Sequence, residues 1–309
     1  MFHSSARRRP ILALLGALVV VGVTGCSETE SAGGASQAPS TDASTSATPT
    51  DASAGFEELE SRFDARLGVY AVDVGTGTDV AWREDERFAY ASTIKALAAA
   101  ALLDRLGIDG VEQQVPIEAD DILPHSPVTE TRVGGTMTLR EIAKAAVTQS
   151  DNAAGNVLFE ALGGPGALDA ALTDLGDDVT SVSRIEPELN QAVPGDEQDT
   201  TTPRAIAGDL HEYVLGDTLT DDEAVLLKEW LTGSQTGDTL VRADLPTDWV
   251  VGDKSGAGGY ASRADIAVIW PTEGAPIVIA VMSDRDEQDA EYDDRLVAEA
   301  AAAAVSALR

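Results

Sequence analysis

Residues 91–103, ASTIKALAAAALL, constrain the fold most strongly, because they describe a helix that cannot lie on a surface. From Ile94 to Leu103 every residue except Lys95 is apolar, so a helix here has no polar face and must be buried on all sides. A buried ammonium is costly unless it is paired, and it tends to lose its proton or to find a partner. We therefore expect Lys95 to meet a polar group inside the protein.

Ser92 lies one turn before Lys95 on the same helical face, within reach of its amine. In the first turn the N–H of Ser92 has no intrahelical partner and can face an oxyanion. A serine beside a buried amine has the arrangement of an activated nucleophile. A helix-capping serine with an incidental lysine gives the same pattern, so Ser-x-x-Lys alone leaves both interpretations open.

Residues 1–25 have the pattern of an export signal. Arginines at positions 7–9 precede an apolar run over residues 10–23, which is too short to span a membrane comfortably. The run ends in V-T-G-C, and Cys26 is the only cysteine, so the stretch resembles a bacterial lipobox whose thiol is acylated. We expect a lipid-anchored protein on the outer face of the bacterial cytoplasmic membrane. A plain cleaved signal, which gives a secreted or periplasmic protein, is the alternative.

Residues 27–54 contain no Leu, Ile, Val or aromatic residue and cannot bury enough apolar surface to fold. We expect a flexible tether over residues 26–55 and a folded part over residues 56–309. The formal net charge of −32 would repel nucleic acid and anionic lipid headgroups, so we expect neither as a partner. We also expect a monomer without a metal or other cofactor.

Strand-like segments lie at both ends of the folded part, with helical segments between them. This order predicts an α/β (α+β) fold in which an antiparallel sheet from both chain ends is flanked by helices, with an all-helical lobe inserted. We expect the α/β lobe at residues 56–91 and 234–309, the helical lobe at 92–233, and the active site at the lobe interface. The expected strands cover residues 67–82 as a pair, 249–256, 264–270 and 276–284, and the expected helices cover 56–66, 92–106, 138–147, 152–162, 166–175, 203–215, 221–231 and 289–308.

Three further stretches carry polar residues at element ends. Ser150, Asp151 and Asn152 fall between two helices, where capping alone explains them. A strand ends at K-S-G, residues 254–256, and a Gly there lets a ligand approach the backbone, although a plain Gly-rich hairpin gives the same pattern. Residues 177–202 lack periodicity, and loops of that length are usually functional or disordered.

Taken in order, these stretches resemble the class A serine β-lactamases, within the superfamily of penicillin-binding proteins and serine β-lactamases. The family motifs S-x-x-K, S-D-N and K-T-G stand here as STIK at 92–95, SDN at 150–152 and KSG at 254–256, with Ser in place of the usual Thr. SPVTE at 126–130 and RIEPELN at 184–190, similar to the family's omega-loop signature, extend the match. The resemblance runs from about Phe56 to the C-terminus.

The resemblance implies hydrolysis of the β-lactam amide of penicillins and cephalosporins, without a cofactor. Ser92 would attack the lactam carbonyl, with the N–H groups of Ser92 and Ala257 as the oxyanion hole. Lys95, Glu186 and a water held with Asn190 would form the base network. Glu186 would then activate the water that releases the acyl group from Ser92.

The remaining matched residues would bind substrate or hold the loop. Ser150 would pass a proton to the leaving lactam nitrogen, with Lys254 nearby. The substrate's acyl-amide group would be held by Asn152, and its carboxylate by Lys254, Ser255 and Arg263. Arg184 and Asp199 would clamp the omega loop, residues 177–202. The chain departs from the family at His125, where Tyr or Trp is common at the mouth of the site.

Two other functions stay open for such a chain. A D,D-carboxypeptidase shares the Ser, Lys and K-S-G parts but remains acylated by penicillin, and a penicillin-binding sensor acylates without turnover. Glu186 resembles the base needed for deacylation and favours a hydrolase. A Ser-His-Asp enzyme and a zinc enzyme are poor rivals, because only His125 and His211 lie outside the signal and cysteine is nearly absent.

Overall fold

The computed structural model describes residues 52–309, so the expected signal, Cys26 and most of the expected tether lie outside the described residues. The helices of the described part are α1 (Ala52–Phe63), α2 (Ile94–Gly110), α3 (Leu139–Thr148), α4 (Asn152–Leu162), α5 (Pro165–Leu175), α6 (Pro203–Leu215), α7 (Asp221–Thr232) and α8 (Asp294–Ala307). Its strands are β1 (Arg66–Asp73), β2 (Asp79–Trp82), β3 (Phe88–Ala89), β4 (Gln114–Pro116), β5 (Thr136–Thr138), β6 (Thr200–Thr201), β7 (Val250–Ala257), β8 (Arg263–Trp270) and β9 (Ile277–Asp284). Short 3₁₀ helices are η1 (Ala91–Thr93), η2 (Ala119–Asp121), η3 (Thr129–Arg132) and η4 (Glu188–Asn190).

The main sheet joins segments from the two ends of the described chain. Its strands lie in the order β2-β1-β9-β8-β7, and all neighbouring strands are antiparallel. Strand β1 pairs along its whole length with β9, from Arg66 opposite Asp284 to Asp73 opposite Ile277. The predicted fold, an antiparallel sheet built from both ends with helices inserted between, is confirmed.

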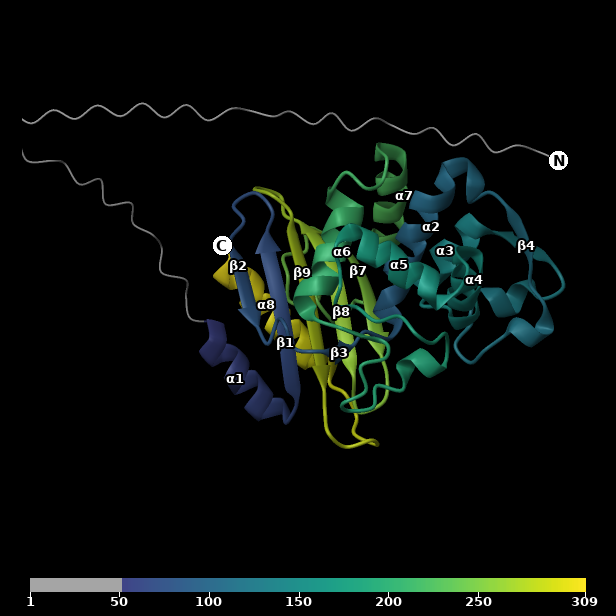
Figure 1. Ribbon diagram of the computed structural model, residues 1–309. Helices are drawn as coiled ribbons and strands as arrows, with labels where there is room; N and C mark the ends of the chain where they lie inside the picture. Colours follow the sequence, from purple (N-terminus) through teal and green to yellow (C-terminus); the bar gives the residue numbers. More distant parts are fainter. Residues whose placement is uncertain (1–51) are drawn as a thin grey trace, which may run out of the picture. The chain divides into compact units, whose positions relative to one another are not determined.

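Helices cover both faces of this sheet (Figure 1). Side chains alternate along β9, so Val278 and Ala280 pack toward α2 and α6, while Ile279 and Val281 pack toward α1 and α8. Because neither face meets water, β8 and β9 consist of nearly continuous Val, Ile and Ala instead of alternating with polar residues. The β7 end of the sheet contacts η1 and α7, which brings the inserted helices to this edge.

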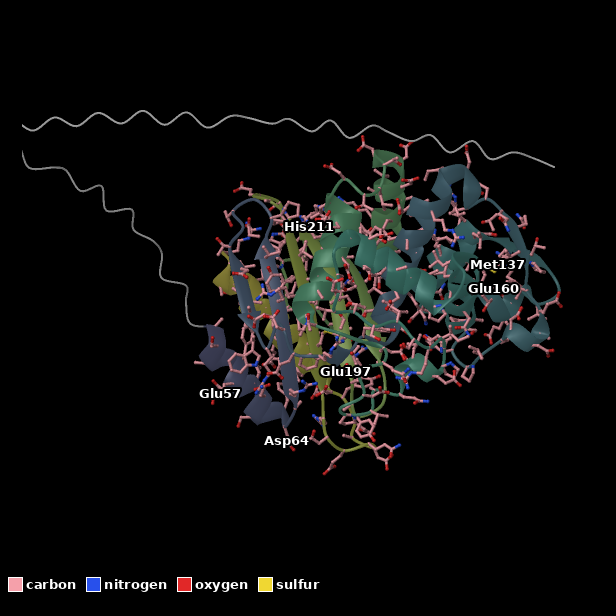
Figure 2. All side chains as sticks on the ribbon, viewed as in Figure 1. Glu57, Asp64, Met137, Glu160, Glu197 and His211 are labelled. Carbon is pink, nitrogen blue, oxygen red and sulfur yellow. The ribbon has the colours of Figure 1, made fainter. Side chains whose placement is uncertain are left out.

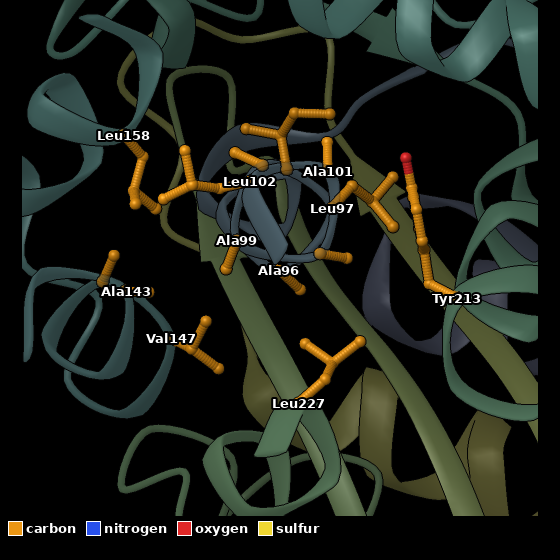
Figure 3. Close-up of a cluster of buried hydrophobic side chains, with 14 of the residues drawn as sticks. Ala96, Leu97, Ala99, Ala101, Leu102, Ala143, Val147, Leu158, Tyr213 and Leu227 are labelled. Atoms are coloured by element: carbon orange, nitrogen blue, oxygen red, sulfur yellow. The ribbon is translucent and has the colours of Figure 1, made fainter. Parts of the chain in front are cut away.

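Helix α2 is buried on all sides, as its composition predicts. Every residue from Ile94 to Leu103, Lys95 included, is buried. The many alanines let neighbouring helices approach closely, and Figure 3 shows α2 end-on, with side chains from α3, α4, α6 and α7 around it. The surrounding side chains labelled there are Ala143, Val147, Leu158, Tyr213 and Leu227.

Several element boundaries differ from the sequence prediction. Helix α1 begins at Ala52, inside the segment expected to be tether, because Ala52 packs against the cluster formed by α1, α8 and the sheet. Arg66, expected at a helix end, is the first residue of β1. Helix α2 continues beyond the expected end at residue 106 to Gly110, with a break at Gly107, whose φ of 70° only glycine adopts readily. The small β3–β6 and β4–β5 ladders were not predicted.

Acidic side chains project from the surface of many different elements (Figure 2). The labelled Glu57, Asp64, Glu160 and Glu197 are all exposed and belong to separate parts of the chain. The negative charge is therefore spread over the surface, where it favours solubility and does not define a particular site.

Candidate active site

Ser92 lies in η1, the tight turn that leads into α2, next to the edge strand β7. The preceding Ala91 has a φ of 47°, an unusual conformation for a residue with a side chain, so this turn is held by its surroundings. Gly256 makes the approach of β7 possible, because a Cβ there would lie 2.8 Å from Tyr90 O and 3.0 Å from Ser92 N. The lack of a side chain at Gly256 therefore lets the backbone of β7 lie against Ser92.

The buried lysine of α2 meets a carboxylate. Lys95 Nζ lies 2.8 Å from Glu186 Oε1, and both side chains are fully buried. The ammonium also donates to Asn152 Oδ1 at 2.7 Å and to Ser150 O at 2.9 Å. Burial lowers the pKa of Lys95, and the charge and hydrogen bond of Glu186 oppose that shift. The expected polar partner of Lys95 is therefore Glu186, supported by two groups from the Ser-Asp-Asn stretch.

Ser92 and Lys95 converge on one carboxylate oxygen. Ser92 Oγ donates to Glu186 Oε1 at 3.1 Å, the same oxygen that Lys95 contacts. The sequence placed Ser92 within reach of the amine, and in the structure no direct hydrogen bond joins the two side chains among the described residues. The reason is that Lys95 is drawn toward Glu186, Asn152 and the carbonyl of Ser150.

The omega loop presents Glu186 to the helices through contacts that fix its backbone. Asn156 of α4, which sequence reasoning missed, accepts from Glu186 N at 2.8 Å and donates to Glu186 O at 2.9 Å. The amide of Asn190 donates to Glu186 Oε2 at 2.5 Å. One signal for Asn156 was available, since it lies four positions after Asn152, on the same face of a helix that has few polar residues.

Arg184 and Asp199 come together at the base of the loop. The guanidinium of Arg184 pairs with Asp199, and the other oxygen of Asp199 accepts from the backbone N–H groups of Ser183 and Arg184, each at 2.9 Å. Tyr90, two residues before Ser92, donates to the same carboxylate at 2.8 Å. The two arms of the loop are therefore tied to each other and to the segment that carries Ser92.

Ser150 and Lys254 form a second polar pair in the site. Ser150 has a φ of 56°, and the neighbouring Asp151 caps α4 by accepting from Ala154 N at 2.9 Å. Lys254 of β7 is fully buried and donates to Ser150 Oγ at 3.0 Å. Burial and the nearby charge of Lys95 lower the pKa of Lys254 to about 7. Its charge is therefore sensitive to pH in the neutral range.

A cavity of about 360 Å³ opens above these groups. Seven of the expected site residues line it, together with His125, Gly256 and two residues that sequence reasoning missed, Thr236 and Tyr292. Lys95, Glu186 and Lys254 are buried behind this lining. The seven expected residues are Ser92, Ser150, Asn152, Asn190, Ser255, Ala257 and Arg263.

The cationic end of this cavity is formed by Arg263 of β8. Its guanidinium donates to Asp294 Oδ1 at 2.7 Å and lies 4.8 Å from the centre of the Tyr292 ring. Beside it, Ser255 Oγ donates to Thr236 Oγ1 at 2.8 Å. Cationic groups and hydroxyls at one end of a cavity suit a carboxylate ligand.

Gly256→Ala is expected to reduce activity strongly, because the new methyl group would push β7 away from Ser92 and Tyr90. We expect a fall in kcat/KM for the reaction at Ser92 and a loss of about 1–3 kcal/mol in the free energy of unfolding. Gly166→Ala on α5 is the control, since a Cβ at that position meets nothing within 4 Å. Equal effects of both substitutions on kcat/KM would show that the close approach at Gly256 is unimportant.

The chemistry offered at this cavity is that of a serine hydrolase, because the Ser92 hydroxyl has a carboxylate beside it that can take its proton.

Comparison with known proteins shows to which family of serine hydrolases the chain belongs. A family model described as "Beta-lactamase enzyme family" matches residues 52–308. A β-lactamase of Amycolatopsis lactamdurans is 56% identical over 253 residues, which cover 82% of this chain and 84% of the relative. A β-lactamase of Bacillus subtilis strain 168 is 48% identical over 82% of this chain and 83% of the relative.

Solved structures agree with the sequence relatives. The crystal structure of a halotolerant bacterial β-lactamase is 48% identical, with a TM-score of 0.81 over 82% of this chain and 98% of that chain. A class A β-lactamase from Clostridium kluyveri DSM 555 is 45% identical, with a TM-score of 0.81 over 82% and 97% of the two chains. The chain belongs to the β-lactamase enzyme family, as a class A serine β-lactamase.

Proposed function

We propose that this β-lactamase works through an acyl-enzyme on Ser92, formed and then released with the help of Glu186. The observation that carries the proposal is the convergence of Ser92 Oγ and Lys95 Nζ on Glu186 Oε1, at 3.1 and 2.8 Å. In acylation the Ser92 O–H bond breaks, the proton passes to the Lys95–Glu186 network, and Oγ bonds to the lactam carbonyl carbon. The N–H groups of Ser92 and Ala257 would stabilise the oxyanion.

Ring opening needs a proton on the leaving lactam nitrogen. Ser150 is the group that supplies it, because its hydroxyl lies in the cavity and Lys254 donates to it at 3.0 Å. Ser255 and Arg263 line the cationic end of the cavity and bind the substrate carboxylate, while Lys254, buried behind this lining, helps to hold it through its positive charge. Asn152 holds the acyl-amide group once the substrate displaces part of its contact with Lys95 or with Pro124 O.

Deacylation separates the hydrolase from its alternatives. Glu186 lies beside Ser92 Oγ, and Asn190 donates to its second carboxylate oxygen, so the two residues can hold a water near the acyl carbonyl. A D,D-carboxypeptidase or a sensor protein lacks a base aimed at this position. The position of Glu186 therefore supports turnover over a persistent acyl-enzyme.

The direct test of this function is steady hydrolysis of a chromogenic cephalosporin by the purified protein. We expect many turnovers per enzyme molecule and loss of the signal when a mechanism-based serine inhibitor is added. A single burst that consumes one equivalent of substrate and then stops would support the sensor or carboxypeptidase function instead.

The activity of this enzyme on anionic β-lactams is expected to fall as the pH rises through about 7, because Lys254 then loses its charge. The lysine is charged below its pKa, so kcat/KM, which reports on the free enzyme, should show an alkaline limb in this range. Lys254→Arg keeps the charge at all these pH values and should move the limb upward. If the alkaline fall of kcat/KM occurs at the same pH in Lys254→Arg, a group other than Lys254 causes it.

Export and lipid anchoring are proposed from residues 1–26. The Arg-rich start, the apolar run and Cys26 support a lipoprotein signal, by the Sec or the twin-arginine route, and we propose a monomer held at the outer face of the cytoplasmic membrane. In the part of the chain that the structure covers, no helix has the length and apolar character needed to cross a bilayer.

Cys26→Ser is expected to release the enzyme from the membrane fraction, because the acylated thiol would be lost. The measurement is β-lactamase activity in membrane and soluble fractions of cells that express the full chain. Activity that stays with the membrane in Cys26→Ser would exclude this cysteine as the anchor.

A further inference from the structure

Two buried carboxyl groups outside the active site each have an oxygen without a partner. Asp209 is 3% exposed and Asp177 is 9% exposed. The Oδ2 atom of each is enclosed and makes no hydrogen bond with any described residue. An unpaired carboxylate oxygen in such a place is costly. Asp177 and Asp209 line the same cavity and interact electrostatically, so two ionised carboxylates here would repel each other unless a proton lies between them.

Asp177 organises the beginning of the omega loop with its other oxygen. Asp177 Oδ1 accepts from Val179 N at 2.7 Å and from Thr180 N at 3.0 Å. Thr180 in turn shares a hydrogen bond of 2.6 Å with Thr201, across the neck of the loop, and Ser181 bridges to Thr200 there. The position of Asp177 therefore controls where both arms of the loop meet.

Asp209 belongs to α6, the helix that follows directly after the second arm of the loop. This helix packs on β1, β8 and β9, so it is a fixed support. A cavity of about 650 Å³ lies beside both carboxyl groups, but their unpaired oxygens are enclosed and do not face it. A cation or other ligand bound in the cavity would thus not contact these oxygens. A proton held between the two carboxyl groups would contact both of them.

We propose that Asp177 and Asp209 share one proton, and that this hydrogen bond fastens the omega loop to α6 and so holds Glu186 in position. The two aspartates are positioning residues that act through the loop and do not touch the substrate. The expected effect on catalysis rests on the proposed role of Glu186 in deacylation. The existence of the shared proton is independent of that role.

Burial raises the pKa of Asp209 from its ordinary value of 3.8 to about 9, and the negative charge of Asp177 adds to the shift, as does the hydrogen bond that the proposed proton makes to Asp177. Between these two values the folded protein binds one more proton here than the unfolded chain does. The free energy of unfolding contributed by this group therefore falls as the pH rises toward 9. Asparagine at position 209 can donate an N–H to Asp177 at any pH and removes this dependence.

Other ionisable groups around the pair do not replace the shared proton. Arg204 of α6 pairs with Asp79, Glu84 and Asp85, and His211 (Figure 2) lies 3.3 Å from Glu212. The groups that line the cavity or interact with Asp209 are Tyr70, Asp85, Asp178, Arg204, His211, Glu212, Tyr213 and, beyond Tyr213, Asp104.

The proton itself is tested by infrared spectroscopy and by carboxyl ¹³C NMR of the wild-type enzyme. We expect the spectrum at pH 7 to contain a protonated carboxyl band that is absent from Asp209→Asn. The difference between the two proteins isolates this band from other buried acids such as Asp265. In the wild type the assigned carboxyl resonance of Asp209 should titrate near pH 9, and this measurement does not depend on how well the variant folds. Ionisation of both carboxyl groups by pH 7 would overturn the proposal.

The positioning role is tested by the pH dependence of deacylation, measured as the decay of the acyl-enzyme in single-turnover mass spectra. Near pH 9 the wild type should deacylate at about half its neutral rate, while Asp209→Asn keeps its rate. Asp178→Asn makes the same Asp-to-Asn replacement at an exposed position of the cavity and should behave like the wild type. Parallel pH profiles for wild type and Asp209→Asn, despite a confirmed proton, would overturn the link to Glu186.

Discussion

Replacing Glu186 by glutamine is expected to leave an enzyme that reacts with β-lactams and then stops. The amide cannot accept a proton, so the water beside the acyl carbonyl loses its base, and general-base catalysis of this kind contributes about 10²–10⁴-fold. We expect kcat to fall by about that factor. Size and most packing contacts are kept, because glutamine is nearly isosteric with glutamate in this buried position.

The separate rates give the sharper form of this prediction. Pre-steady-state measurements with a chromogenic cephalosporin should show a burst of one equivalent in Glu186→Gln, followed by very slow turnover. Acylation should fall less than deacylation, because Lys95 remains next to Ser92 as a second possible base. Glu188→Gln, which changes an acid in the same loop, should retain wild-type turnover. A variant that loses acylation and deacylation equally would assign Glu186 to both steps alike.

Replacing Ser92 by alanine is expected to abolish covalent catalysis altogether. Removal of the nucleophile from other serine hydrolases costs about 10⁶-fold in kcat, and a loss of that order is expected here. Stability should change little. The side chain of Ser92 makes a single hydrogen bond, to Glu186, and Lys95 still pairs with the same carboxylate oxygen in the variant. The measurement is kcat/KM together with the thermal unfolding temperature of the same preparation.

The double variant Ser92→Ala, Glu186→Gln shows whether the two residues belong to one pathway. If Glu186 acts only through Ser92, in forming and releasing its acyl group, the double variant should be no less active than Ser92→Ala alone. Ser126→Ala is the control for the loss of a buried serine hydroxyl. The Ser126 hydroxyl accepts a hydrogen bond from Ala153 N and does not line the cavity. An activity in the double variant far below that of Ser92→Ala would show a second, Ser92-independent role for Glu186.

The sequence predicted the fold well where a single physical requirement decided the outcome. Helix α2 has no polar face and could only be central, and the Val- and Ile-rich strands near the C-terminus needed cover on both faces. Thr138 and Glu141 have the spacing of a capping box, and they form one at the start of α3. Boundaries were less predictable where packing overrides local preference, as at Ala52, which joins α1 because it reaches the core.

The site could be predicted from the sequence in its residues but not in its contacts. The resemblance to class A β-lactamases pointed to Ser92, Lys95 and Glu186, and the structure brings them together. Which atom meets which depends on three-dimensional placement. The sequence therefore missed the clamp by Asn156, and it did not show that Ser92 and Lys95 meet at a single oxygen of Glu186. The buried pair of Asp177 and Asp209 has no local pattern at all, because its members are brought together only by folding.

Intact-protein mass spectrometry of wild type and Glu186→Gln, sampled over time after mixing with a penicillin, tests the central claim most directly. We predict that the wild type returns rapidly to its unmodified mass, while Glu186→Gln retains one acyl group, which peptide mapping locates on Ser92. A persistent adduct on the wild type, or no adduct on Ser92 in the variant, would contradict an acyl-enzyme that Glu186 releases.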